Sequence, residues 1–304
     1  MTSSNDAATP NRAASATPYR AAGSLRGRTI LMSGGSRGIG LAIATRAAQD
    51  GANIVLLAKT DQPHATLAGT VHSAAEQIEA AGGQALAIVG DVRNDEDVAG
   101  AVAAAAERFG GIDVVINNAS AIDLSTTDHV DMKRYDLMQD INVRGTFLLS
   151  KLSLPALRQS GNGHILTLSP PLNLDPKWAG RHLAYTMAKY GMSLTTLGLA
   201  EELKNDRINV NSLWPCTLID TAAIRNMPGG EAIVQAARGP QIMADAAHAI
   251  LTGSNQAGTP LAGKGSASGN FYTDEQVLKA AGVTDFRPYS LGAAEEQLVP
   301  DIFL

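Results

Sequence analysis

Cysteine is almost absent from this chain of 304 residues. Cys216 is the single copy, so no disulfide can form within the chain, and such usage is typical of a reducing compartment. Acidic residues outnumber basic ones, and the formal net charge of −5 argues against a nucleic-acid-binding surface. No apolar run approaches the ~20 residues that span a membrane. His64 has no second His or Cys at metal-ligand spacing, so no metal site is expected.

The first 24 residues lack apolar periodicity. Residues 1–24 are rich in Ala, Ser and Thr and contain two prolines, which predicts a disordered leader. The segment bears arginines and almost no acids, which is also the composition of an organelle transit peptide. The preferred interpretation is a tail on a cytoplasmic protein, and organelle targeting stays open. Residues 25–304 show no internal repeat and no second core, so they are expected to form one domain.

From residue 29 onward, short apolar runs alternate with segments of helical spacing. Alternating strands and helices predict an α/β fold, here a single Rossmann-type doubly wound parallel sheet with helices on both faces. The strands are expected at residues 29–32, 53–57, 84–89, 113–116, 164–168, 208–213 and 269–273. The helices are expected at 41–50, 71–81, 94–109, 131–159, 185–203, 241–251 and 274–281, with a loop before 183 and a mobile segment with one short helix at 218–239.

A glycine-rich turn, residues 33–40, joins the first expected strand to the first expected helix. Such a turn presents free backbone N–H groups and the positive end of the helix dipole, which together attract a pyrophosphate. Glycine is frequent in this chain, with 30 copies, so chance glycine spacings are common and the strand-turn-helix context carries the argument. The sequence therefore predicts phosphate binding at this turn.

The end of the second expected strand bears on the choice of nucleotide. A fold that prefers NAD places an acid about 20 residues past the glycines, where it binds the ribose 2′-hydroxyl. Here the strand ends at Ala58–Lys59–Thr60, and Asp61 follows only afterwards. Lys59, with Arg37 from the turn, suits a 2′-phosphate, so NADP(H) is preferred and NAD(H) remains possible. The alternative is that Lys59 is a solvated lysine at a strand end.

Tyr185 and Lys189 are four residues apart on an expected helix and therefore share one face. A nearby ammonium favours the phenolate and is expected to lower the pKa of the tyrosine, which then exchanges a proton with a carbonyl or an alcohol. The pair alone is a weak signal because it occurs by chance in many helices. Asn142, between Ile141 and Val143, is a further polar candidate, although a satisfied helix asparagine is the alternative.

Five features in this order resemble the short-chain dehydrogenase/reductase family. They are the turn at 33–40, Asp91 after the third strand, Asn117–Asn118–Ala119 after the fourth, Asn142, and the pair Tyr185 and Lys189. The resemblance covers residues 25–304. It implies an NADP(H)-dependent oxidoreductase that moves a hydride between a nicotinamide and a small-molecule carbonyl or alcohol. It also implies a homodimer or homotetramer, formed by the helices after residue 131 and at 185–203.

The resemblance further implies a role for each matching position. The nucleotide phosphates would be held by Gly34, Ser36, Arg37, Gly38, Ile39 and Gly40, the adenosine end would be contacted by Lys59, Asp91 and Val92, and Asn118 would lie along the cofactor. Tyr185 would be the proton donor or acceptor. Lys189 would bind the nicotinamide ribose and support the charge of the tyrosine, and Asn142 would help a water connect that lysine to solvent.

Two positions depart from the family pattern. The serine that usually contacts the reacting oxygen aligns with Pro170, which has no side-chain donor, and Ser169 lies one residue earlier on the opposite side of the strand. Loss of such a donor costs about 3 kcal/mol in the transition state. Either Ser169 is redirected by the two prolines, another group replaces it, or the chemistry is slow. Cys216 stands where the family commonly has glycine, and a structural role is preferred for it.

Two alternatives to an ordinary reductase follow. The Pro170 position favours a nucleotide-binding homologue with weak or lost turnover. Residues 58–64, 169–174, 184–192, 211–215 and 300–304 resemble a subgroup of the family in which a sterol-carrier domain follows the dehydrogenase. This chain stops before such a domain and therefore looks like the catalytic half. A lipid-like or acyl-thioester substrate is compatible with that likeness.

Overall fold

The computed structural model describes residues 17–63, 68–227, 229–253 and 267–304. These residues form a parallel sheet of seven strands in the order β3-β2-β1-β4-β5-β6-β7. The α/β class and the Rossmann-type sheet predicted from the sequence are thereby confirmed. The strands are β1 (Thr29–Ser33), β2 (Asn53–Ala58), β3 (Gln84–Val89), β4 (Val114–Asn117), β5 (Gly163–Thr167), β6 (Ile208–Trp214) and β7 (Phe271–Thr273).

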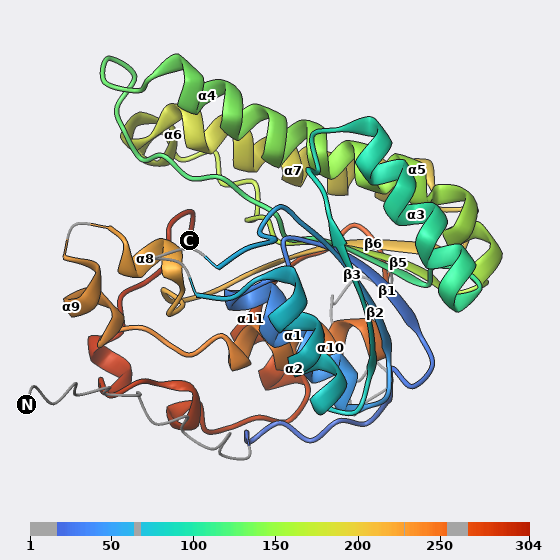
Figure 1. Cartoon of the computed structure of the whole chain (residues 1–304). Coiled ribbons are helices and arrows are strands. Elements are labelled where there is room, and N and C mark those ends of the chain that lie inside the picture. Colours follow the sequence, from blue (N-terminus) through green and yellow to red (C-terminus); the bar gives the residue numbers. More distant parts are fainter. Residues whose placement is uncertain (1–16, 64–67, 228, 254–266) are drawn as a thin grey trace, which may run out of the picture.

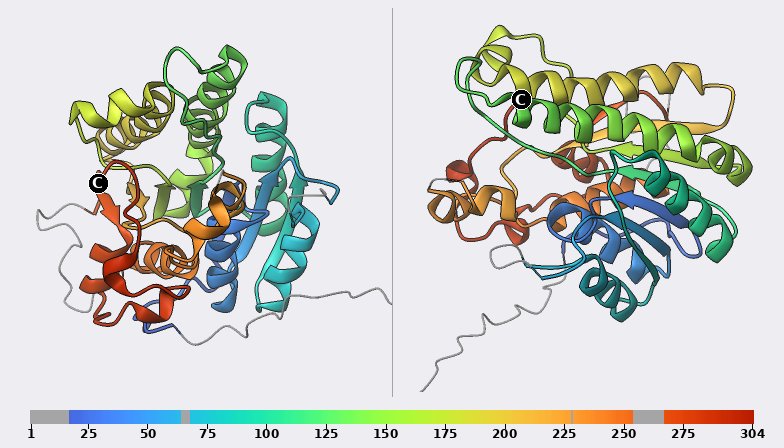
Figure 2. Two further views of the ribbon diagram at one scale, coloured as in Figure 1. Left: turned by 90° about the vertical axis from the view of Figure 1, so that its left-hand side faces the viewer. Right: turned by 45° about the horizontal axis from the view of Figure 1, so that its top comes forward.

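Helices cover both faces of the sheet (Figure 1). One face carries α3 (Asp95–Phe109), α4 (Met132–Met138), α5 (Gly145–Ser160), α6 (Pro176–Arg181) and α7 (Leu183–Glu202), and the other carries α1 (Gly38–Gln49), α2 (Val71–Ala80), α10 (Gln241–Thr252) and α11 (Asp274–Ala280). The short helices are α8 (Ala222–Arg225), α9 (Gly230–Val234), a π-helical segment η1 (Gln139–Arg144), and the 3-10 turns η2 (Arg287–Tyr289) and η3 (Glu295–Gln297). The two further views of Figure 2 show the same layers.

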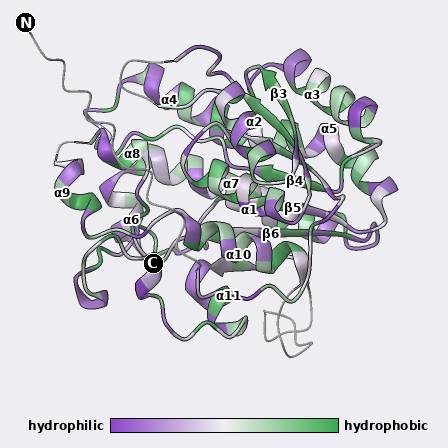
Figure 3. Cartoon of the chain, turned by 60° about the horizontal axis from the view of Figure 1, so that its bottom comes forward, coloured by the Kyte–Doolittle hydropathy of each residue, from purple (hydrophilic) through white to green (hydrophobic). Residues whose placement is uncertain are grey.

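The alternation of side chains along each strand divides the core in two. Ile30 and Met32 of β1 belong to the core under α1, α2, α10 and α11, whereas Leu31 between them belongs to the core under α3, α5 and α7. A strand covered on both faces must be apolar throughout, which is why the strands read as continuous hydrophobic runs. Figure 3 shows this concentration of hydrophobic residues along the sheet.

The strand order reverses at β1, which pairs with β2 on one side and with β4 on the other. Connections leave β1 and β4 in opposite directions, so a crevice opens beyond their carboxyl ends. Ser33 at the end of β1 is in register with Asn117 at the end of β4. This topology brings the glycine turn and the residues after Asn117 to the same place.

Three segments differ from the elements expected from the sequence. The expected loop before residue 183 contains α6, which Asp175 caps through the Lys177 N–H and which starts on Pro176. The single helix expected at 131–159 is divided by η1, which contains Asn142. Residues 218–239 hold two short helices rather than one.

The described residues begin before the domain boundary expected at residue 25. Residues 1–16, His64 and most of the loop after α10 lie outside the described residues. Within residues 17–24, Tyr19 is buried and its hydroxyl lies 3.0 Å from His248 Nδ1 on α10. The last part of the expected leader therefore packs on the domain.

The last six residues, 299–304, which we call the C-terminal strap, pair with the chain that leaves β6. The Leu218 N–H donates to the Val299 carbonyl, and the Asp301 N–H donates to the Cys216 carbonyl. The indole Nε1 of Trp214 donates to the Ile302 carbonyl over 2.9 Å. These bonds bring the end of the chain to the carboxyl edge of the sheet.

Candidate functional site

A cavity of about 560 Å³ lies beyond the carboxyl ends of the central strands. This volume is within the range of small-molecule sites. The structure brings most of the predicted residues to its lining, namely Gly34, Ser36, Arg37, Gly38, Ile39, Lys59, Asp91, Val92, Asn118, Tyr185 and Lys189. Gly40, Asn142 and Ser169 are the predicted residues that lie outside the lining described for this cavity.

The N-terminus of α1 opens into the cavity without a side-chain cap. Thr70 and Asn94 cap the next two helices by accepting a backbone N–H, whereas Arg37 at the start of α1 makes no such bond. The first turn of α1 also contains no acidic residue among those described. Its N–H groups and the positive end of the dipole are thus left for an anion from outside the helix.

Close approach of backbone explains two glycines of the turn. A Cβ on Gly34 would lie 2.8 Å from the Ala119 Cα, and the residue has a φ of +73°. A Cβ on Gly40 would lie 2.5 Å from the Asn118 side-chain nitrogen. Gly40 therefore supports the site by making room for Asn118 rather than by lining the cavity.

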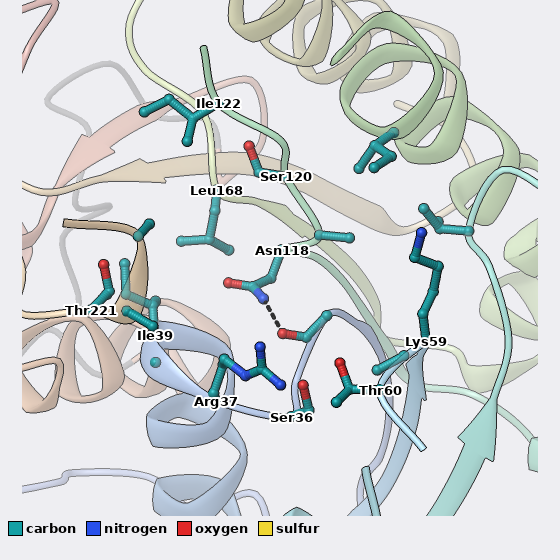
Figure 4. Close-up of a pocket in the computed structure, with 18 of the residues that line it drawn as sticks. Ser36, Arg37, Ile39, Lys59, Thr60, Asn118, Ser120, Ile122, Leu168 and Thr221 are labelled. Carbon is teal, nitrogen blue, oxygen red and sulfur yellow. Dashed lines mark hydrogen bonds between the residues drawn. The ribbon is translucent and has the colours of Figure 1, made fainter. Parts of the chain in front are cut away.

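Asn118 holds the glycine turn in place. Its Nδ2 donates to the Gly34 carbonyl over 2.7 Å, the bond drawn as a dashed line in Figure 4. In the same view, Ser36 and Arg37 lie on one side of Asn118, and Ser120 and Ile122 lie on the other. Asn118 thus separates a polar end of the cavity from a more apolar one.

At the polar end, Lys59 and Arg37 come from β2 and from the turn. The Lys59 ammonium is 3.5 Å from Asp91, which Arg93 holds through a 2.6 Å bond from Nη2. The hydrogen bonds from Arg93 lower the pKa of Asp91 to about 2, so this carboxylate stays charged. Arg37 donates from Nη2 to the Gly69 carbonyl, and its buried Nε has no partner among the described residues.

At the other end, α7 places Tyr185 and Lys189 side by side. Both are buried, and the Lys189 Nζ donates to the Leu168 carbonyl over 2.9 Å and lies 5.1 Å from the centre of the Trp214 ring. The Tyr185 hydroxyl has no hydrogen-bond partner among the residues that the structure describes. It is therefore available to a molecule in the cavity.

Burial dominates the electrostatics of this pair. Desolvation lowers the pKa of Lys189 to about 7, and the Asp301 carboxylate opposes this shift. Desolvation also raises the pKa of the Tyr185 phenol, and the same carboxylate adds to the rise. The expectation that Lys189 lowers the pKa of Tyr185 is therefore wrong for the protein alone, because both groups lose hydration together.

Asn142 acts on the backbone that follows β4. Its Oδ1 accepts the Ala121 N–H over 2.8 Å, and its Nδ2 donates to the Ala121 carbonyl over 3.0 Å. The side chain is fully buried and belongs to the π-helical segment η1. Asn142 thus fixes the loop that carries Asn118 and Ser120.

Comparison with known proteins identifies the family. The model of the short chain dehydrogenase family matches residues 28–230. The chain belongs to the short-chain dehydrogenase/reductase family. The resemblance inferred from the turn, the asparagines and the Tyr185–Lys189 pair is thereby confirmed.

Relatives within this family are similar over nearly the whole chain. Hydroxysteroid dehydrogenase-like protein 2 of Danio rerio is 51% identical over 282 residues, and the Homo sapiens protein is 49% identical over the same length. The alignments cover 93% of this chain but only 65% and 64% of the relatives. A crystal structure of a dehydrogenase from Xanthomonas campestris is 49% identical, with a TM-score of 0.85 over 92% of this chain and 99% of that one.

The likeness to one subgroup of the family, predicted from residues 58–64, 169–174, 184–192, 211–215 and 300–304, is confirmed by this similarity to hydroxysteroid dehydrogenase-like protein 2. The matching segments include residues 184–192, from which Tyr185 and Lys189 line the cavity, and residues 300–304, whose Phe303 ring packs on Tyr185. No group of three or more His, Cys, Asp or Glu is arranged to hold a metal ion in the described part of this short-chain dehydrogenase. Within the same residues, no helix is both long and apolar enough to cross a membrane.

The serine position of this short-chain dehydrogenase is unusual in structure as well as in sequence. The Ser169 hydroxyl is fully buried and lies 2.8 Å from Ser212 Oγ, so the two prolines do not redirect it into the cavity. Ser120, which sequence reasoning missed, lines the cavity and is exposed. Its hydroxyl makes only a 3.5 Å contact with the neighbouring Ala121 carbonyl. Its position directly after Asn117–Asn118–Ala119 was the sequence signal that could have indicated a place in the cavity.

Proposed function

We propose that this chain is an NADP(H)-dependent reductase of apolar carbonyl compounds. The observation that supports this function best is the joint position of Tyr185 and Lys189 in the cavity into which the uncapped end of α1 opens. One end of this cavity suits phosphates and the other suits proton transfer. The family is one of oxidoreductases, and the proposal adds the nucleotide, the direction and the substrate class.

The residues present fit a dinucleotide. Free N–H groups at α1 would donate to the pyrophosphate oxygens, and the Gly34 and Gly40 contacts leave no room for side chains there. Lys59 and Arg37, which both line the cavity, would meet a 2′-phosphate, while Asp61 bonds instead to His72 over 2.8 Å. When bound, the nicotinamide supplies the hydride, and the chain supplies orientation and protons.

The protonated state of the Tyr185 phenol suits the reducing direction. At neutral pH its phenol is protonated, so its hydroxyl would donate to the oxygen of a carbonyl and then give up the proton. Lys189, with a pKa of about 7, would hold the nicotinamide ribose and stabilise the phenolate that forms. Asn142 would position the loop after β4. It would also help a water molecule to connect Lys189 to solvent.

Ser120 is our candidate for the second donor to the reacting oxygen. Pro170 has no donor, and Ser169 is bonded to Ser212. Ser120 lies beyond Asn118 from the phosphate turn, on the same side as Leu168 and Ile122 (Figure 4). A hydroxyl aimed at a developing oxyanion stabilises it by about 3 kcal/mol.

The substrate class follows from the side chains around Tyr185. Ile122, Leu168 and Trp214 are apolar lining residues near Tyr185 and Lys189. An apolar carbonyl would bury its chain here and present its oxygen to Tyr185. The likeness to hydroxysteroid dehydrogenase-like protein 2 is compatible with a lipid-like substrate.

The test is oxidation of NADPH, followed at 340 nm, with a panel of long-chain aldehydes, ketones and fatty-acyl carbonyls. The wild type should oxidise NADPH with at least one apolar carbonyl, and Tyr185→Phe should lower kcat by about 10³-fold. NADPH affinity should be equal in the two proteins, because the phenol does not hold phosphates. Tyr190→Phe, a neighbouring tyrosine bonded to the Asn173 carbonyl, is the control and should keep most of the activity.

The second candidate is a nucleotide-binding homologue with weak or lost turnover. The engaged Ser169 hydroxyl and Pro170 favour it. NADPH binding by the wild type, with no oxidation beyond that of Tyr185→Phe for any carbonyl of the panel, would decide in its favour.

A homo-oligomer is the proposed assembly. Large apolar side chains are exposed on α5 and α7, namely Phe147, Met187, Leu194 and Leu197. Exposed apolar patches mark interfaces, and these helices are the contact expected from the sequence. Sedimentation should give a dimer or a tetramer, and Leu194→Arg should shift it toward the monomer.

A further inference from the structure

The C-terminal strap contacts three different segments around the catalytic end of the cavity. Besides the bonds to Cys216 and Leu218, its Phe303 carbonyl accepts from Asn173 Nδ2 in the loop after β5, over 3.3 Å. Trp214 at the end of β6 donates to Ile302. The strap is thus fixed on the loops that follow both β5 and β6.

Phe303 fills the centre of an aromatic cluster. Its side chain is fully buried, and its ring lies 6.1 Å from that of Tyr185 at an interplanar angle of 28°, a stacked arrangement. Four more rings lie with their centres 5.3 to 6.0 Å from it, those of Trp178, His182, Tyr190 and Trp214. Stacked and edge-on aromatic pairs at these distances favour particular ring orientations.

The backbone of Phe303 is strained. Its φ is +76°, and Arg207 is the other non-glycine residue at positive φ within the described ranges. A bulky side chain in this region costs on the order of 1 kcal/mol or more and persists where its surroundings over-determine it. The bonds of the strap and the aromatic cluster provide that constraint.

The position of the Tyr185 hydroxyl depends on ring packing. Since this hydroxyl has no hydrogen-bond partner among the described residues, no bond from the protein fixes its direction. Phe303 stacks on one side of the phenol ring, and His182 meets it edge-on with the centres 6.0 Å apart. The strap also carries the Asp301 carboxyl, which acts electrostatically on both Tyr185 and Lys189.

We propose that the strap is part of the active site and that Phe303 is a positioning residue, holding the Tyr185 phenol in the orientation needed for proton transfer. The proposal rests on the reductase function proposed above. It extends the site from the residues of the family pattern to the last residues of this chain.

Ring-labelled tyrosine provides a test that needs no turnover. The chain has six tyrosines, so the Tyr185 signal in a ¹H–¹³C spectrum is assigned by its loss in Tyr185→Phe. In Phe303→Leu, the Tyr185 and Tyr190 signals should shift and the Tyr185 signal should broaden. Phe286→Leu is the matched control, because Phe286 is also buried but its ring faces Tyr289 at 6.3 Å. It should move the Tyr289 signal instead.

Kinetics separate positioning from stability. Both Phe→Leu variants should lose a few degrees in Tm, and assays are run below the lower Tm. Phe303→Leu should lower kcat at least tenfold, with KM and the NADPH dissociation constant within about twofold, because misplacement of a catalytic group slows the chemical step. Phe286→Leu should keep the wild-type kcat, because its ring packs on Tyr289 and not on Tyr185.

An unchanged Tyr185 signal in folded Phe303→Leu, or a kcat equal to that of Phe286→Leu, would overturn the proposal. If Phe303→Leu does not fold, Phe303→Met is used, which keeps an apolar side chain without the ring stack. A wild type with no activity on any carbonyl refutes the reductase function alone, because the tyrosine spectrum still decides whether Phe303 orients Tyr185.

Discussion

The two ends of the cavity are built in different ways. At the phosphate end, the turn and the start of α1 are consecutive in sequence, and their shape follows from glycines and an uncapped helix. At the catalytic end, Tyr185 is surrounded by α6, the end of β6 and the strap, which are far apart in the chain. The first end is therefore a local structure, whereas the second depends on tertiary packing. The predictions below test that difference.

After Tyr185→Phe, the largest effect is expected at the catalytic end, from Ser120. Ser120→Ala should lower kcat about a hundredfold, since one donor to the reacting oxygen is lost. Ser169→Ala should leave kcat within about threefold and cost about 1 kcal/mol of stability, because its hydroxyl bonds Ser212. Steady-state kinetics of both variants decide between the two serines. The reverse order would restore Ser169 as the catalytic serine.

A pH dependence of stability is expected from Lys189. Its folded pKa of about 7 lies below that of an unfolded lysine, so the folded state loses stability at and below pH 7 and recovers it as the pH rises toward 10. Replacement by Met removes this penalty. Lys189→Met should therefore gain stability relative to wild type at pH 7, and this gain should shrink by roughly 3 kcal/mol by pH 10.

Thermal unfolding of both proteins at pH 7, 8, 9 and 10 measures this difference. Lys151→Met, at an exposed position of α5, is the control and should show no such trend. A gain that stays constant over this range would show that Lys189 is not desolvated in the folded protein.

At the phosphate end, a methyl group should be enough to disturb binding. Gly40→Ala places a Cβ 2.5 Å from the Asn118 amide and 2.9 Å from the Gly34 carbonyl, so the turn must shift. The NADPH dissociation constant, measured by fluorescence, should rise about tenfold. Gly100→Ala in α3 is the matched control, because no atom lies within 4 Å of the added methyl, and it should leave binding unchanged.

The smallest effect concerns nucleotide choice. Lys59 is half exposed, so its contribution is screened by solvent. Lys59→Ala should lower the ratio of kcat/KM for NADPH over NADH by about fivefold, and added salt should reduce the difference. An unchanged ratio would make Lys59 only the ion-pair partner of Asp91.

The phosphate end of the cavity was predictable from the sequence, whereas the packing around Tyr185 at the catalytic end was not. The strand, the turn and the helix follow from apolar runs and glycines. The cavity lining contains Gly34, Ser36, Arg37, Gly38 and Ile39 of the predicted turn. Tyr185 and Lys189 were found because helical spacing puts them on one face. Phe303 was missed because nothing near it in the sequence shows that its ring would reach residue 185.

The pKa values at the catalytic end could not be predicted from the sequence either. The pKa of Tyr185 depends on how much water surrounds it, and spacing on a helix contains no such information. Asn142 shows a similar limit. A buried asparagine in a helix was foreseen, but the π-helical turn and the paired bonds to Ala121 depend on a loop 21 residues away.

Those paired bonds have a consequence for protein engineering. Ala121 is three residues after Asn118, so one short loop is anchored to η1 at one end and to the Gly34 carbonyl at the other. Library mutations in this loop would change cofactor affinity and turnover together. The opposite wall, residues 221–226, includes the short helix α8 and lines the cavity without either anchor. Variation there is the more independent route to altered substrate preference.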